Sequence, residues 1–296
     1  MKNRIILCLI TMLTFLVCTA GEYSDGSIEG ELVKNGNSKM TQESLVYNGT
    51  TLNYWLYSPA NNIESLPLLI YLHGGSGKGD DLNNLLAGGF PKYLYDGDLG
   101  NLNAYVIIPQ LAKDLVGWSD IAATLRELII ETADKHHCDK SRISITGHSM
   151  GGTGTWSIAA KYPELFFRIA PMSGSITNTE ANVNALREST IWAFVGSADV
   201  IVNPQSSIDF INTLNSNKAK CTVIENATHF DIPQVYVSQE YDITDWLLGQ
   251  DVSTGINQIS VNKDTSKTGY YDLQGRKIAN PLHGLYINNR HVIFVK

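Results

Sequence analysis

The chain has 296 residues, of which 43% are hydrophobic and 17% are charged, and its formal net charge is −7. This composition favours one large globular domain with a sizeable core over a disordered chain. The chain has no block of basic residues, so nucleic acid is not an expected partner. Its four cysteines form no CxxC pair and have no histidine at zinc-finger spacing, so no metal site and no cofactor are expected.

The first twenty residues have the pattern of a secretory signal peptide. Lys2 and Arg4 precede an apolar run over residues 5–17, and small residues end the segment at Ala20. The run is too short for a transmembrane span, so we expect cleavage after Ala20 and a secreted protein in the periplasm, at the cell surface or outside the cell. The alternative is a lipoprotein signal in which Cys18 is acylated. Cleavage removes two cations and changes the formal net charge from −7 to −9.

Cleavage also leaves Cys138 and Cys221 as the remaining cysteines. An oxidising compartment permits a disulfide between them. Each lies where the end of a strand or helix buries a small apolar group, so two buried thiols are expected, with the disulfide as the alternative.

A polar segment over residues 21–40 is expected to be a linker, and the domain over 41–249 opens with a hairpin. Asn48-Gly49 separates two β-rich runs at 44–47 and 51–57, which is a strong hairpin signal. Six short apolar runs then have the pattern of strands buried on both faces: 68–72, 105–109, 143–146, 169–172, 191–195 and 221–224. Residues with helical spacing fill gaps between them, over 121–132, 156–160 and 208–214. This alternation predicts an α/β fold with a doubly wound, mostly parallel sheet, whose ligands bind at the carboxyl ends of the strands.

The segment Gly147-His148-Ser149-Met150-Gly151 matches the pattern G-x-S-x-G. It follows the expected strand 143–146 and opens a helix that ends near Lys161. This is the context of a nucleophile elbow, in which glycines allow a tight turn that exposes the serine. We therefore expect Ser149 to be a nucleophile.

A nucleophilic serine needs a histidine base that a carboxylate orients, and in this fold the chain order is serine, acid, histidine. His229 is the one histidine after Ser149 that lies within the domain, and it follows the expected strand 221–224. Asp199 follows the expected strand 191–195. The other acids between Ser149 and His229 lie in or after helices, beside a strand or, for Glu180 and Glu188, in a polar connection. The predicted catalytic residues are therefore Ser149, Asp199 and His229.

Acyl transfer also needs backbone donors for the oxyanion. The expected donors are the N–H groups of Met150 and of Gly75, with Gly74 as the second choice, in the glycine-rich loop that follows the strand 68–72. A phosphate-binding loop does not fit, because Leu72 and Gly79 replace the glycine and the Ser/Thr that such a loop requires.

His148, Trp118 and Phe230 are the predicted substrate-binding residues, although a large aromatic such as Trp118 or Tyr162 is also typical of a core. The connections at the strand ends are modest in length. We therefore expect an open pocket that suits small or polymer-attached acyl groups.

Several stretches resemble secreted α/β-hydrolases of the esterase and polyhydroxybutyrate-depolymerase-like type, a group that includes predicted peptidases and relatives of feruloyl and acetyl-xylan esterases. The resembling stretches are 71–75, 108–110, Trp118, 141–156, 192–199 and 245–248. The resemblance implies a serine ester hydrolase with Ser149, Asp199 and His229 at the triad positions. Its expected substrates are short-chain or aryl esters, free or linked to a polysaccharide.

Residues 250–264 are expected to be a second linker, and residues 265–296 a β-rich tail. The stretches 272–276 and 284–287 resemble C-terminal sorting tails of type IX secretion, which implies the secretion machinery as a partner. The alternative is a β appendage of the hydrolase. Two other functions stay open: a peptidase or thioesterase that uses the same triad, and a non-catalytic secreted binding protein.

Overall fold

The structure is a computed structural model that describes residues 31–32, 38–60, 65–250 and four strands between residues 270 and 295. The chain divides into two compact units, Met1–Asp251 and Val252–Lys296. The predicted signal peptide, residues 1–20, lies outside the described residues. No helix in the described part has both the length and the apolar character needed to cross a membrane.

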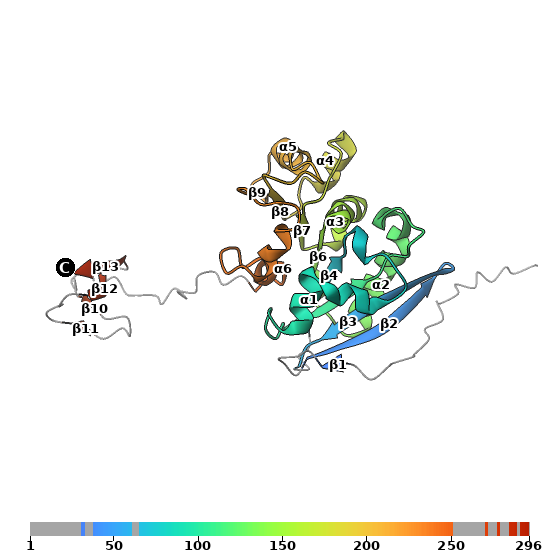
Figure 1. The fold of residues 1–296 in the computed structure, drawn as a ribbon, viewed down its shortest axis with the longest axis horizontal. Helices are drawn as coiled ribbons and strands as arrows, with labels where there is room; N and C mark the ends of the chain where they lie inside the picture. Colours follow the sequence, from blue (N-terminus) through green and yellow to red (C-terminus); the bar gives the residue numbers. More distant parts are fainter. Residues whose placement is uncertain are drawn as a thin grey trace, which may run out of the picture. The chain divides into compact units, whose positions relative to one another are not determined.

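The first unit contains a nine-stranded sheet with the strand order β1-β2-β3-β5-β4-β6-β7-β8-β9 (Figure 1). Neighbouring strands are antiparallel from β1 to β5 in this order and parallel from β5 to β9. The strands are β1 (Glu31–Leu32), β2 (Lys39–Tyr47), β3 (Thr50–Ser58), β4 (Leu68–Leu72), β5 (Tyr105–Pro109), β6 (Ile143–His148), β7 (Arg168–Met172), β8 (Ile191–Gly196) and β9 (Ala219–Ile224). The predicted doubly wound, mostly parallel sheet is confirmed.

The predicted hairpin is formed by β2 and β3, with Tyr47 opposite Thr50. Asn48 and Gly49 both have positive φ values, 49° and 78°, which a two-residue hairpin turn of this hand requires. The strand β2 begins at Lys39 and β1 precedes it, so part of the expected linker 21–40 belongs to the sheet. Met40 pairs with Tyr57 and is fully buried, so the buried part of β2 begins before the expected boundary.

The parallel strands are buried on both faces, and β4 shows the arrangement. Leu68, Ile70 and Leu72 face one hydrophobic cluster, while Leu69 and Tyr71 face the other. The strand β9 differs from the prediction, since none of its residues is fully buried. It lies at the edge of the sheet and has one neighbouring strand, so part of its surface stays open to solvent.

Helices cover both faces of the sheet (Figure 1). The cluster that contains Leu68 receives side chains from α2 (Ala122–Lys135), α3 (Met150–Lys161), α4 (Glu180–Leu186) and α5 (Gln205–Leu214). The cluster that contains Leu69 receives them from the 3₁₀ helices η2 (Leu82–Ala87) and η6 (Ile232–Val237), and from α1 (Gly89–Asp96) and α6 (Ile243–Leu247).

The helix α4 corrects the sequence interpretation, which placed Glu180 in a polar connection. Glu180 is the first residue of α4, and the side chain of Thr179 caps the helix by accepting a hydrogen bond from Asn182 N–H. Val183 and Leu186, three residues apart, form the buried face of α4. Two apolar residues in a polar segment are too few to predict a helix from the sequence.

Cys138 and Cys221, the cysteines among the described residues, are free thiols. Cys138 is buried and Cys221 is half-buried. Burial raises the pKa of both thiols to about 12, so they are neutral and unreactive.

The second unit contains a four-stranded antiparallel sheet with the order β11-β10-β12-β13. Its strands are β10 (Tyr270–Tyr271), β11 (Lys277–Ile278), β12 (Gly284–Asn288) and β13 (His291–Val295). The predicted small β unit at the C-terminus is therefore confirmed. Apart from residue 250, the predicted linker 250–264 lies outside the described residues.

Candidate active site

Ser149 lies at the turn between β6 and α3, with φ 61° and ψ −120°. A positive φ is uncommon for a residue with a side chain and costs of order 1–3 kcal/mol, so the surrounding structure must hold it. The Ser149 N–H donates to the carbonyl of Met172 in β7 (2.9 Å), which fixes the turn against the next strand.

The two glycines of the G-x-S-x-G pattern are needed because the turn packs against the end of β4. A Cβ atom on Gly147 would lie 2.5 Å from the carbonyl oxygen of Leu72, and one on Gly151 would lie 1.8 Å from the same oxygen. Real side chains do not tolerate either distance. The tight turn that the sequence predicted is thus formed by direct contact between two backbones.

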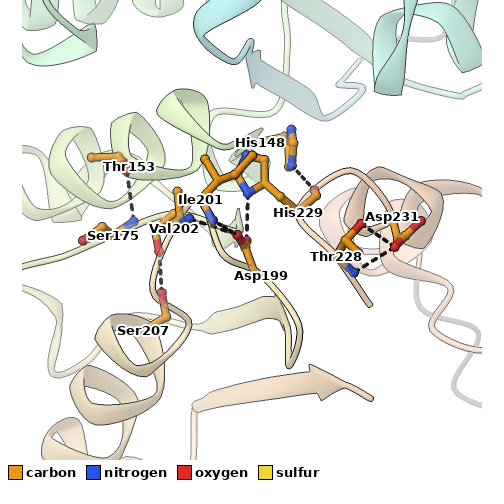
Figure 2. Close-up of polar contacts among 11 residues, drawn as sticks. His148, Thr153, Ser175, Asp199, Ile201, Val202, Ser207, Thr228, His229 and Asp231 are labelled. Carbon is orange, nitrogen blue, oxygen red and sulfur yellow. Dashed lines mark hydrogen bonds and ion pairs between the residues drawn. The ribbon is translucent and has the colours of Figure 1, made fainter. Parts of the chain in front are cut away.

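Asp199 and His229 form a buried pair (Figure 2). The Nδ1–H of His229 donates to Asp199 Oδ2 (2.7 Å), and the side chains are 4% and 1% exposed. The other carboxylate oxygen accepts hydrogen bonds from the N–H groups of Ile201 and Val202, each 2.9 Å long. With Nδ1 engaged by Asp199, Nε2 is the ring nitrogen of His229 that remains for proton exchange.

The carboxylate of Asp199 is ionised in this setting. Burial opposes the charge, but hydrogen bonds from Val202 N–H, His229 and Ile201 N–H outweigh it, and the pKa of Asp199 lies below its ordinary value. A carboxylate of this kind fixes the imidazole orientation and favours a proton on Nδ1.

Ser149 and His229 line one cleft of about 570 Å³, a volume typical of small-molecule sites. Asp199 lies behind His229. The cleft is lined by Tyr71, His73, Gly74, Gly75, Ser76, Gly77, Asn84, Leu85, Ala87, Gly88, Gly89, Pro91, Tyr93, His148, Ser149, Ile201, His229, Phe230 and Pro233. None of these described residues is an aspartate, glutamate, lysine or arginine, so the cleft suits an uncharged ligand.

The glycine-rich loop after β4 forms the side of the cleft next to Ser149. A Cβ atom on Gly74 would lie 3.4 Å from the Ser149 Cβ, so this glycine lets the loop pack closely on the elbow. A Cβ atom on Gly75 would have no described atom of the surrounding structure within 4 Å, so this position faces open space. The N–H of Met150 opens α3 and has no partner within the helix, as at any helix N-terminus.

A buried histidine, His73, holds this loop. Its Nε2 accepts a hydrogen bond from Leu111 N–H (2.9 Å), so its Nδ1 carries the proton and donates to the carbonyl of Gly74 (2.6 Å). Burial lowers the pKa of His73 to about 4. The imidazole is therefore a neutral structural link between the loop and the segment after β5.

His148, a predicted substrate-binding residue, lines the cleft, and it has a contact that the sequence did not indicate. Its Nε2–H donates to the backbone carbonyl of His229 (2.9 Å), and the two rings lie 4.7 Å apart (Figure 2). Burial, followed by the neighbouring His229, lowers the pKa of His148 to about 4. The residue before the elbow serine thus joins β6 to the loop that carries His229.

Trp118 does not line the cleft and belongs to the core, the alternative that the sequence left open. Its side chain is 1% exposed. The indole packs directly against Gly154, so closely that a Cβ atom at this position would lie 2.5 Å from the ring. The indole Nε1–H donates to the carbonyl of His73 (3.2 Å), so Trp118 holds the start of the glycine-rich loop from the core. Phe230, in contrast, lies at the rim of the cleft and is 73% exposed.

Sequence reasoning missed one wall of the cleft, which Tyr71 and the segment from Asn84 to Tyr93 provide. Tyr71 looked like a core residue of a buried strand. The helix α1 was not anticipated, although Phe90 and Leu94, four residues apart and both buried, are the signal that predicts it.

Comparison with known proteins agrees with this fold. A protein-family model described as PETase, PET hydrolase-like, matches residues 120–247. Acetylxylan esterase A from Aspergillus awamori is 25% identical over 183 residues, which is 56% of this chain and 56% of that protein.

Solved structures show the same likeness. A thermostable esterase superposes with a TM-score of 0.59 at 23% identity, over 71% of this chain and 62% of that one. A mutant of the feruloyl esterase module from Clostridium thermocellum, complexed with sinapinate, superposes with a TM-score of 0.56 at 15% identity, over 75% and 95%. This chain has the α/β-hydrolase fold, and the predicted resemblance to the esterases of that fold is confirmed. The chain spans 56% of the length of the curated relative that it matches.

Proposed function

We propose that this protein is a serine carboxylic ester hydrolase that acts through an acyl-enzyme. The observation that carries the proposal is the buried hydrogen bond between His229 Nδ1 and Asp199, behind a cleft that Ser149 lines from a turn with positive φ. The relatives and structural neighbours that are esterases support the same class.

In the proposed mechanism, Ser149 Oγ attacks the ester carbonyl while its proton passes to Nε2 of His229. Asp199 stabilises the imidazolium that forms. The N–H groups of Met150 and Gly75 bind the oxyanion. His229 then gives the proton to the leaving alcohol, and water that His229 deprotonates releases the acid and restores Ser149.

The expected substrates are uncharged esters of acetyl or aryl acids, free or attached to a polysaccharide. The absence of charged side chains from the described lining of the cleft favours such esters. It disfavours a peptidase that binds a free N-terminal amine, since such a site needs a carboxylate. The similar proteins include an acetylxylan esterase and a feruloyl esterase module, and they support the same range.

The test compares the protein with Ser149→Ala on p-nitrophenyl acetate, p-nitrophenyl butyrate, methyl ferulate, a thioester and a chromogenic peptide. We expect ester turnover that Ser149→Ala lowers by several orders of magnitude, with the fold intact by circular dichroism. A fluorophosphonate probe should label the protein and not the variant. Turnover that survives in Ser149→Ala contradicts the mechanism, and a protein that is neither labelled nor active is instead a binding protein.

We further propose that the protein is secreted and that residues 1–20 are removed. Mass spectrometry of the exported protein should then find Gly21 at its N-terminus, whereas a lipid-modified Cys18 would contradict this assignment. Deletion of residues 265–296 tests the sorting tail. Export is lost if these residues are the signal and persists if they are only an appendage of the hydrolase.

A further inference from the structure

The proposed mechanism gives no role to His148, although this residue lines the cleft directly before Ser149 in the chain. His148 is the last residue of the central strand β6, and it pairs with Met172 of β7. The carbonyl of Met172 also accepts the N–H of Ser149 (2.9 Å). The imidazole of His148 therefore extends from a backbone that is fixed together with that of the nucleophile.

The loop that carries His229 has weaker support from the sheet, because it follows the edge strand β9. Ala227 is fixed, since its carbonyl accepts the N–H of Ala198 after β8 (3.0 Å). The contacts of Thr228 stay within the loop, where its N–H and its hydroxyl donate to the carboxylate of Asp231 (2.8 and 2.6 Å). The position of the proposed base thus depends on the contacts that His229 itself makes.

Two hydrogen bonds hold His229 at opposite ends of the residue (Figure 2). The Nε2–H of His148 donates to its backbone carbonyl (2.9 Å), and its own Nδ1–H donates to Asp199 (2.7 Å). The first bond fixes the backbone from which the imidazole extends, and the second fixes the rotation of the ring. Loss of either bond lets the base move relative to Ser149.

The hydrogen bond from His148 comes from a neutral donor. Burial, followed by the neighbouring His229, lowers the pKa of His148 to about 4, so its ring carries one N–H at neutral pH. A carbonyl only accepts hydrogen bonds, so this N–H is on Nε2. The two rings lie 4.7 Å apart, and a charged donor at this distance would oppose the protonation of His229 that catalysis requires.

This contact distinguishes between two roles for a histidine in the cleft. A residue that binds substrate offers its polar hydrogen to the ligand, whereas the Nε2–H of His148 is already engaged by the carbonyl of His229. The partner is also the residue that exchanges protons with Ser149 in the proposed mechanism. A link of this kind couples the position of the base to that of the nucleophile.

We propose that His148 is a positioning residue, which holds the backbone carbonyl of His229 and thereby sets the approach of the catalytic base to Ser149. The inference rests on the proposed ester hydrolase function. It adds to that function a residue that acts through His229.

The test compares three substitutions that differ in reach. In His148→Gln the amide NH₂ takes the place of the Nε2–H, whereas in His148→Asn the amide is one bond too short to reach the carbonyl. His148→Phe keeps a ring and removes the donor. Because a small misplacement of a catalytic group has a large effect on rate, we expect kcat on p-nitrophenyl acetate to fall by about 10–100-fold in His148→Asn and His148→Phe. In His148→Gln it should stay within about threefold of the parent value.

The rate of fluorophosphonate labelling separates positioning from substrate binding. The probe reports how readily Ser149 attacks and does not require a bound ester. In His148→Asn and His148→Phe the labelling rate constant should fall in proportion to kcat, while KM changes by less than about threefold. A raised KM with an unchanged labelling rate would assign His148 to substrate binding and overturn the inference.

His136→Phe is the matched control, because His136 is a half-buried histidine outside the cleft. Its kcat and labelling rate should equal those of the parent protein. Urea titration shows whether each variant folds. If His148→Phe does not fold, His148→Gln and His148→Asn decide the question, and equal kcat values for these two overturn the inference.

The parent protein separates failure of this inference from failure of the hydrolase function. Parent-level kcat and labelling in all three His148 variants overturn the positioning role and leave the hydrolase function standing. Absence of both labelling and ester turnover in the parent protein contradicts the hydrolase function itself, and the positioning role with it.

Discussion

At the scale of single residues, the geometry of Asp199 predicts a specific effect of removing its charge. One oxygen of the carboxylate accepts two backbone N–H groups and the other accepts His229 Nδ1–H. In Asp199→Asn the amide oxygen can keep the backbone contacts, but the amide NH₂ then faces Nδ1 and favours the tautomer with the proton on Nε2. Because this tautomer cannot accept the serine proton, we expect kcat to fall by about 10³–10⁴-fold with little change in KM. Steady-state kinetics on p-nitrophenyl acetate checks this, and a loss below tenfold would contradict the proposed role.

The glycines of the active site differ sharply in what they tolerate. Gly151→Ala places a methyl group 1.8 Å from a backbone oxygen of β4, so we expect a loss of about 3 kcal/mol or more in the free energy of unfolding. Gly75→Ala is the matched control, since no described atom lies within 4 Å of its new methyl group. Its stability should stay within about 0.5 kcal/mol of the parent protein. Urea titration measures both, and similar stabilities for the two variants would show that the elbow can relax.

At the scale of elements, the loop after β4 depends on a histidine that does no chemistry. His73→Phe keeps a ring of similar size but leaves the N–H of Leu111 buried without a partner, which costs about 1–3 kcal/mol. The same change frees the carbonyl of Gly74, so the loop that carries the Gly75 donor should move. We expect kcat to fall by up to about 100-fold, with a smaller change in KM.

His136→Phe is the control for this change. The Nε2 of His136 is buried and has no hydrogen-bond partner among the described residues, and its ring packs 4.6 Å from that of Tyr105. We expect the stability of this variant to be unchanged or higher, and its kcat unchanged. Equal effects of the two substitutions on kcat would refute a special role for His73.

The sequence predicted elements best where burial leaves an unbroken signal. The central strand β4 is apolar at every position because both of its faces are covered, and its bounds agree with the prediction. The edge strand β9 was predicted from a similar apolar run over 221–224, but none of its residues is fully buried. A local sequence pattern does not show whether a strand lies at the edge of a sheet. The helices α1 and α4 were missed because each buries only a short apolar face in a sequence rich in turn-forming residues.

At the scale of the whole molecule, chain order predicted which residues approach one another. Ser149, Asp199 and His229 follow β6, β8 and β9, and parallel strands bring these ends to one edge of the sheet. The wall that contains Tyr71 was not predictable in this way, since it depends on how η2 and α1 fold over the cleft. Trp118 shows the same limit, because only the packing against Gly154 distinguishes a buried support from a pocket wall.

The buried neutral histidines predict how the stability of the first unit responds to acid. The pKa values of His73 and His148 are lowered to about 4, mainly by burial, whereas in the unfolded chain they are close to the ordinary value of 6.5. Between pH 4 and 6.5 the unfolded state therefore binds more protons than the folded state, and stability falls as the pH is lowered through this window. Each histidine contributes up to ~1.4 kcal/mol per pH unit there, and neither contributes a pH dependence above about 7. The urea midpoint should be flat between about pH 7 and 8 and decline steadily from pH 6.5 to 4. His73→Phe, although less stable at neutral pH, should decline with a visibly smaller slope, and an unchanged slope would mean that His73 is not a buried neutral group.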